Sequence, residues 1–199
     1  MERINYNQRA QILAPQLIGK VIEYNGVKYM ITVTEAYPYN DDNSYVKRSE
    51  KGKGHDLLTG EDKIGNLFVY AGMLHIACDG GNGNWENEYS CDNVLIRGAI
   101  KVVDGIFDCD TDKKLYYKQG KPYTLCKTKL GIMDNDLCIK PGSNNTDVRL
   151  YDFNKKYSYN SEDTERSEIK DAQRVNIKED TGIKLRFYLS ESMFEEQKK

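Results

Sequence analysis

The sequence has no run of apolar residues long enough to span a bilayer, and no apolar segment near its start that resembles a signal peptide. It has only five cysteines in 199 residues, and none of them forms a CxxC pair. An odd number of cysteines without such spacing indicates reduced thiols rather than a disulfide framework. We therefore expect a cytoplasmic protein, or a nuclear one in a eukaryote, with no membrane partner.

Histidine is scarce as well, with two residues, and positive charge is not in excess, since the formal net charge is −2. Two histidines leave little room for a nucleophile–base triad, and no GxSxG motif is present. The charge balance argues mildly against binding to a nucleic-acid duplex. Basic residues do gather between positions 47 and 53, so a local basic patch remains open.

The metal-ligand patterns are incomplete. His75 and Cys78 are three residues apart, and Cys91 follows a glycine-rich turn, but no further pair completes the four ligands of a zinc site. Three alternate aspartates at 108–112 have the spacing of an EF-hand loop, but a lysine stands where that loop needs glycine. We expect no metal and no cofactor.

Strand patterns dominate what the sequence does contain. They predict one α+β domain over residues 1–199, rich in antiparallel strands, with residues 190–199 as a flexible tail. The dipeptide Asn25-Gly26 is a strong hairpin signal between the first two strands. The expected helices cover 8–14, with a second turn from Pro15 to residue 19, and 122–130. The expected strands include 27–37, 66–78, 92–103, 148–153, 174–178 and 184–189. The polar stretches 38–62 and 154–171 are expected to be loops, the first with one helical turn.

Glu35 lies on an unexpected face of its strand. The alternation through Val27–Tyr37 is that of a half-buried strand, with every second residue from Val27 on an apolar face, and Glu35 and Tyr37 fall on that same face. A carboxylate there would lose water and would be a candidate base or nucleophile in a pocket. The alternative is a bulge near the strand end that turns Glu35 back to solvent.

Arg97 is enclosed by apolar neighbours in the segment VLIRGAI. A guanidinium in such a place needs an anion, because an unpaired buried charge is costly. Its partner could be an acidic side chain such as Glu35 or the phosphate of a ligand, and the residues alone do not decide between them.

Four segments together resemble the alkyladenine (3-methyladenine) DNA glycosylase family: LAPQLIGK (13–20), VTEAY (33–37), NVLIRGAI (93–100) and KLRFYLS (184–190). FVYAGM (68–73) and GKPYTLCKTKLGI (120–132) fit the family more loosely. The resemblance implies a single compact domain around a curved antiparallel sheet with flanking helices. It also implies an enzyme of base excision repair that flips a damaged purine out of duplex DNA and hydrolyses its N-glycosidic bond.

The resemblance also implies roles for particular residues. Glu35 matches the catalytic glutamate that activates water, and Arg97 matches the arginine that grips the DNA backbone beside the flipped nucleotide. Tyr37 and Tyr70 match the aromatic residues that line the base pocket. A discriminating asparagine of the family falls at Cys78 or Asp79. The implied partner is damaged duplex DNA, approached from the minor groove by a monomer that needs neither metal nor cofactor.

The sequence departs from the family pattern at further places besides the asparagine position. The family histidine about eleven residues beyond the catalytic glutamate is Val46 here, and FVYAGM is two residues shorter than its counterpart. Either Tyr70 therefore acts as the wedge that fills the gap in the duplex, or the wedge is missing. We expect a monofunctional glycosylase for alkylated, positively charged purines. The alternatives are a diverged module that binds a nucleobase or nucleic acid with little or no catalysis, and a hydrolase acting on a free nucleoside.

Overall fold

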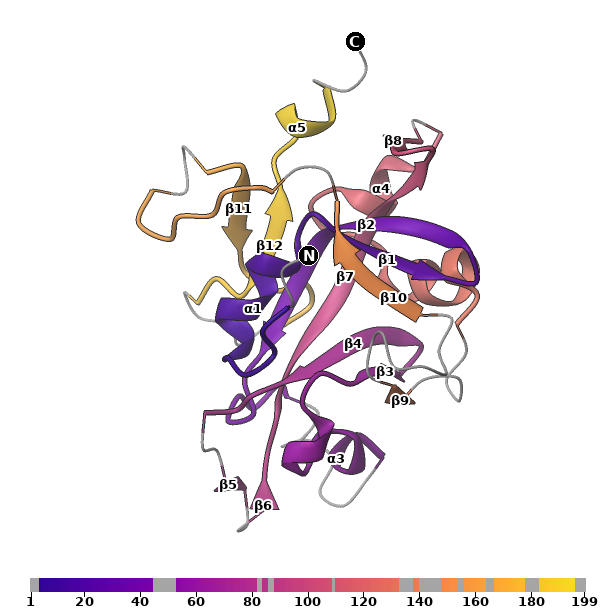
Figure 1. Ribbon diagram of the computed structural model, residues 1–199. Coiled ribbons are helices and arrows are strands. Elements are labelled where there is room, and N and C mark those ends of the chain that lie inside the picture. Colours follow the sequence, from indigo (N-terminus) through magenta and orange to yellow (C-terminus); the bar gives the residue numbers. More distant parts are fainter. Residues whose placement is uncertain are drawn as a thin grey trace.

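The computed structural model describes residues 4–44, 53–81, 84–85, 88–108, 110–132, 138–139, 148–153, 156–163, 167–177 and 183–195. Its centre is an antiparallel sheet in the order β10-β1-β2-β7-β4-β3-β9 (Figure 1). The strands on this path are β1 Lys20–Tyr24, β2 Val27–Tyr37, β3 Leu67–Tyr70, β4 Met73–Cys78, β7 Asp92–Val103, β9 Cys138–Ile139 and β10 Val148–Asp152. The sheet curls into a half-barrel, which confirms the expected α+β fold.

The remaining elements attach to this sheet. Strand β12 pairs with the second half of β2, on the side where β1 pairs with the first half, and β11 continues beyond β12. None of the described helices is long and apolar enough to cross a membrane. The other elements are β5 Asn84–Trp85, β6 Glu88–Tyr89, β8 Ile106–Phe107, β11 Ile169–Ala172, β12 Arg186–Leu189, α1 Ala10–Leu17, α3 Lys53–Leu58, η1 Glu61–Lys63, α4 Lys113–Tyr116, η2 Thr124–Leu130 and α5 Ser192–Glu195.

The central strand β2 is buried on both faces, so the expectation of a half-buried strand is wrong. Every residue from Tyr29 to Tyr37 is enclosed. The two threonines on the second face are buried with partners, since Thr32 Oγ1 donates to Tyr116 O (2.6 Å) and Thr34 Oγ1 donates to Ala14 O in α1 (2.9 Å). Helix α1 therefore covers the threonine face of β2 (Figure 1), and Glu35 points to the opposite face.

The pairing of β2 with β7 is interrupted once and then restored. The register shifts between Ile31 and Val33 and again between Val33 and Thr34, so one residue on each strand stays without a partner in the ladder. Beyond these shifts, Glu35 stands opposite Leu95 in the same register as before. A bulge is thus present, but the second shift compensates it, and Glu35 is 0% exposed.

Two turns explain where the strands begin and end. Asn25 and Gly26 take positive φ (49° and 78°), and the predicted hairpin is confirmed. Residues 66–78 form a hairpin rather than a single strand, because Ala71 and Gly72 also take positive φ (51° and 73°). The helix predicted at 122–130 is confirmed, with a π-type turn over 124–130 and Gly131 in the left-handed region.

Other predictions need adjustment. The strand expected at 174–178 is wrong, since the pairing segment is β11 and residues 173–177 follow it as a loop. The stretch 38–62, expected to be a loop with one helical turn, contains both α3 and the start of η1. Residues 45–52, with Val46 and most of the basic cluster, lie outside the described residues. Within the segment expected to be a flexible tail, Ser192–Glu195 form α5, and Phe194 is buried against Tyr116 with ring centroids 4.8 Å apart.

Candidate active site

A row of paired residues crosses five strands and passes through Glu35. Glu35 on β2 is paired with Arg186 on β12 and with Leu95 on β7. Leu95 pairs with His75 on β4, which pairs with Phe68 on β3. Residues that face each other across antiparallel strands project to the same side, so all five share the face opposite α1. Residues two positions along on the same strands project to this face too.

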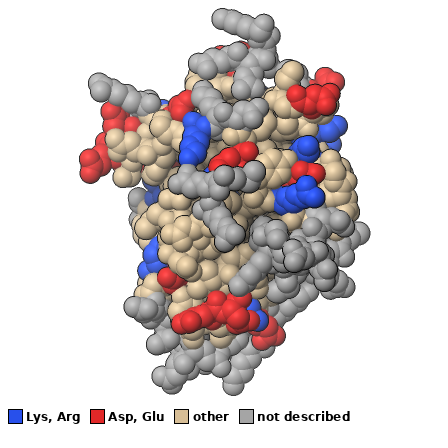
Figure 2. Space-filling model, in the orientation of Figure 1, with Lys and Arg blue, Asp and Glu red and all other residues tan. Residues whose placement is uncertain are grey.

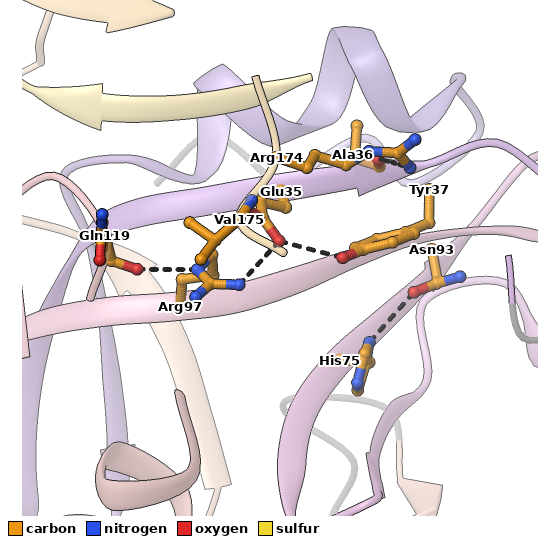
Figure 3. A network of polar contacts seen from close by, with 9 residues as sticks. All are labelled: Glu35, Ala36, Tyr37, His75, Asn93, Arg97, Gln119, Arg174 and Val175. Carbon is orange, nitrogen blue, oxygen red and sulfur yellow. Dashed lines mark hydrogen bonds and ion pairs between the residues drawn. The ribbon is translucent and has the colours of Figure 1, made fainter. Parts of the chain in front are cut away.

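Both carboxylate oxygens of Glu35 accept hydrogen bonds (Figure 3). Oε2 accepts from Arg97 Nη1 (2.9 Å) and from the Tyr37 hydroxyl (3.0 Å), and Oε1 accepts from the backbone amide of Val175 (2.8 Å). Glu35 is completely enclosed, and the side chain of Arg97 is 10% exposed. All three hydrogen-bond partners are donors, which suits an ionised carboxylate, since its oxygens only accept. The acidic partner foreseen as one of two alternatives for Arg97 is therefore Glu35.

Arg97 is fixed by a second contact with the backbone. Its Nε donates to Gln119 O (2.7 Å), in the turn that follows α4. Gly120 allows this turn to lie against β7, because it takes φ +63° and a Cβ at this position would lie 2.4 Å from Arg97 O. Two of the guanidinium nitrogens are thus engaged inside the protein, and the group is aimed at Glu35.

Arg174 anchors the loop 173–177, which lies over Glu35. Its guanidinium lies 4.7 Å from the centroid of the Tyr37 ring, and its Nη1 contacts Asp41 Oδ2 (2.5 Å) and Ala36 O (3.3 Å). The next residue, Val175, supplies the amide that binds Glu35. The sequence prediction missed both residues because it placed them in a strand. The signal was an arginine next to apolar residues in the segment QRVNI, as at Arg97.

A buried polar pair lies further along the same face. His75 Nδ1 is 3.0 Å from Asn93 Oδ1, and the His75 ring stacks on Phe68 with centroids 5.2 Å apart and an interplanar angle of 11°. Burial lowers the pKa of His75 to about 4, so the imidazole is neutral near pH 7. Asn93 is paired with Tyr37 across β2 and β7, which places this neutral pair beside the Tyr37 ring. The sequence prediction did not identify either residue.

The remaining predicted site residues are not brought to Glu35. Tyr70 ends β3 on the same face, but β4 lies between β3 and β7, so two inter-strand steps separate it from Arg97. Cys78 is buried in the main core, with the thiol pKa raised by burial, whereas its neighbour Ala77 packs in the smaller cluster on the Glu35 side.

Asp79 lies just beyond β4 and is also engaged away from the carboxylate. It accepts from the Tyr89 hydroxyl and from the Gly81 amide, and the Tyr89 contact is the main reason that the pKa of Asp79 is lowered. Of the residues predicted for the pocket, Tyr37 and Arg97 therefore meet Glu35 directly. Within the described part of the chain, no group of three histidine, cysteine, aspartate or glutamate residues is arranged to hold a metal ion.

Two comparisons relate most of the chain to known proteins. The family model described as methylpurine-DNA glycosylase matches residues 4–193. A protein of Corynebacterium efficiens named "Putative 3-methyladenine DNA glycosylase" is 27% identical over 188 residues, which cover 94% of this chain and 90% of that protein.

Proposed function

Because the chain belongs to the methylpurine-DNA glycosylase family, we propose that it removes alkylated purines from DNA by hydrolysis, with Glu35 acting on the attacking water. The observation that carries the proposal is the Glu35 carboxylate, which is fully enclosed and held by Arg97, Tyr37 and a backbone amide. Such an anion is preorganised to meet positive charge that develops on a sugar.

The contacts of Glu35 leave room for one more donor. A carboxylate offers about four acceptor positions, and the three hydrogen bonds described use two on Oε2 and one on Oε1. The free position on Oε1 can accept a proton of the attacking water. Arg97 acts as a positioning residue, since its two contacts fix the direction of the carboxylate. Tyr37 would present its ring to the extruded base while its hydroxyl binds Glu35.

One carboxylate suffices for an alkylated purine. The alkyl group gives the base a positive charge, so it leaves without a separate acid, whereas O-glycosides need a pair of carboxyl groups. The preferred substrates are therefore positively charged purines of the 3-methyladenine type. The enzyme would act as a monofunctional glycosylase and a monomer on damaged duplex DNA, from the minor-groove side, in the cytosol or nucleus where DNA is repaired.

A second function is favoured by one observation. Glu35 is 0% exposed, and Val175 and the residues around it close the approach to the carboxylate. An enclosure that does not open would make the protein a module that binds a nucleobase or nucleic acid without releasing a base.

The decisive experiment compares the native protein with Glu35→Gln. Duplex and single-stranded oligonucleotides that carry 3-methyladenine, 7-methylguanine, ethenoadenine or hypoxanthine are incubated with each protein, and abasic sites are scored. We expect release of the methylated purines and a loss of at least a hundredfold in Glu35→Gln. Glu162→Gln, an exposed change of the same type, should keep full activity. Equal release by Glu35→Gln would remove Glu35 from catalysis, and binding without release by the native protein would favour the second function.

A further inference from the structure

The site contains a second guanidinium that no acidic group of the described residues neutralises at close range. Arg186 stands directly opposite Glu35 in the pairing of β12 with β2. Among the described residues no carboxylate lies within 4 Å of it, and its buried Nε has no hydrogen-bond partner. Burial lowers the pKa of Arg186; the Glu35 charge opposes this shift most, the Arg97 charge adds to it, and Tyr188 also opposes it.

The charges around Glu35 therefore do not balance. Arg97 and Arg186 contribute two positive charges, and Glu35, already hydrogen-bonded to Arg97, contributes one negative charge. A partly desolvated cation without a counterion is costly, so a site of this kind favours the entry of an anion. Arg97 already uses Nη1 and Nε inside the protein, whereas Arg186 has an unused Nε–H and is partly exposed.

Aromatic rings connect Arg186 with the protein surface. The Arg186 guanidinium lies 5.8 Å from the centroid of the Tyr188 ring, and Tyr188 meets Tyr117 edge-on at 6.4 Å. On the far side, Lys118 Nζ lies 5.2 Å from the Tyr117 ring, and Lys118 is exposed. Two adjacent rings thus link the Arg186 guanidinium beside Glu35 with an exposed cation, Lys118.

We propose that Arg186 binds a backbone phosphate next to the flipped nucleotide, and that Lys118 contacts a further phosphate of the same strand. A guanidinium can offer Nε–H and Nη–H together to two oxygens of one phosphate, and this pairing would supply the missing partner of Arg186 Nε. The inference rests on the proposed action on DNA. Arg186 and Lys118 would supply local positive charge for DNA in a protein whose net charge is −2. On the face shown in Figure 2, the described basic and acidic side chains are interspersed.

The test measures binding rather than base release. The dissociation constant for a duplex with a stable abasic-site analogue is determined from 50 to 300 mM salt for the native protein, Arg186→Met, Arg186→Lys and Lys118→Met. Each lost phosphate contact should reduce the slope of log affinity against log salt by about 0.9. Arg186→Met should also weaken binding about tenfold at 100 mM salt. Arg186→Lys should keep the slope, because the charge remains, but should bind less tightly, because an ammonium cannot form the two parallel hydrogen bonds of a guanidinium.

Lys20→Met is the matched control, since Lys20 is a paired cation beside residues of α1, on the other face of the sheet. It should change neither the slope nor the affinity. An unchanged slope in Arg186→Met would overturn the assignment, even if affinity fell, because Arg186 would then act only within the protein. Calorimetry with inorganic phosphate distinguishes a site for free phosphate from a site for a DNA phosphate. If Arg186→Met abolished the binding of inorganic phosphate but left the salt slope for DNA unchanged, the assignment to a DNA phosphate would also be overturned.

The two proposals fail in different ways. A native protein that releases no base but loses about 0.9 of slope in Arg186→Met would refute the glycosylase proposal and support the phosphate site. Full base release with a native slope in Arg186→Met would refute the phosphate site alone.

Discussion

Replacing Arg97 with methionine should destabilise the fold much more than replacing Glu35 with glutamine. Without Arg97, a carboxylate that is 0% exposed keeps, among the described residues, the Tyr37 hydroxyl and one backbone amide as donors. Removing one partner of a buried ion pair typically costs about 3–5 kcal/mol, because the other charge stays buried. Glutamine at position 35 keeps an acceptor for Arg97, so we expect a loss of about 1–2 kcal/mol, the difference between charged and neutral hydrogen bonds.

Urea unfolding at pH 7, followed by circular dichroism, measures both changes. Lys121→Met is a suitable control, since it removes one partner of the exposed Lys121–Asp112 pair (2.9 Å) and should change the free energy of unfolding little, because water screens that pair. The double variant Glu35→Gln/Arg97→Met should be more stable than Arg97→Met alone, because it no longer buries a carboxylate that has lost its hydrogen-bonded cation. If Arg97→Met cost no more than Lys121→Met, or if the double variant were the least stable, the Glu35–Arg97 pair would not be the buried contact described above.

Three further predictions concern stability and the geometry of the site. The pKa of His75 is about 4 in the folded protein and about 6.5 in the unfolded chain. Its contribution to the free energy of unfolding is therefore complete above pH 6.5 and should decline by about 3 kcal/mol as the pH falls to 4. In urea titrations His75→Phe should lack this decline, and equal pH dependence in both proteins would contradict the assignment. Gly120→Ala should lower base release, and it should reduce the free energy of unfolding by more than the about 1–2 kcal/mol of a left-handed alanine, because its Cβ meets Arg97 O. Gly131→Ala, with open space around it, is the control and should show that conformational cost alone. Phe194→Ala should cost about 3–5 kcal/mol in the same assay, and a native midpoint would show that α5 does not stabilise the domain.

Much of the sheet could be predicted from local patterns. The Asn25-Gly26 turn and the long strand at 92–103 were read correctly, since positive-φ residues and apolar runs are direct signals. The hairpin within 66–78 was missed because its turn uses Ala71, a residue that seldom takes positive φ. The strand expected at 174–178 was misplaced because a few apolar residues also suit a loop that packs over a site.

The site was predictable only in part. Alternation left Glu35 open between a buried carboxylate and a bulge until the resemblance was added, and the cost of a buried charge indicated Arg97. Their contact depends on a register that two compensating shifts restore. Gln119 and Val175 contribute backbone atoms, so their side chains carry no signal of the contact. The resemblance placed Cys78 among the pocket residues, yet one step along a strand reverses the face, and the thiol lies in the main core.

The partners of Glu35 are far from it along the chain. Arg97 follows 62 residues later and Val175 follows 140 residues later, and Gln119, which orients Arg97, lies between them. At a synthesis rate of 5–20 residues per second, the ribosome would need on the order of ten seconds to deliver Val175 after Glu35. Contacts of such sequence separation also form slowly during folding. The capacity to act on DNA should therefore be among the last properties that a newly made chain acquires, and a fragment that ends before Val175 should not acquire it.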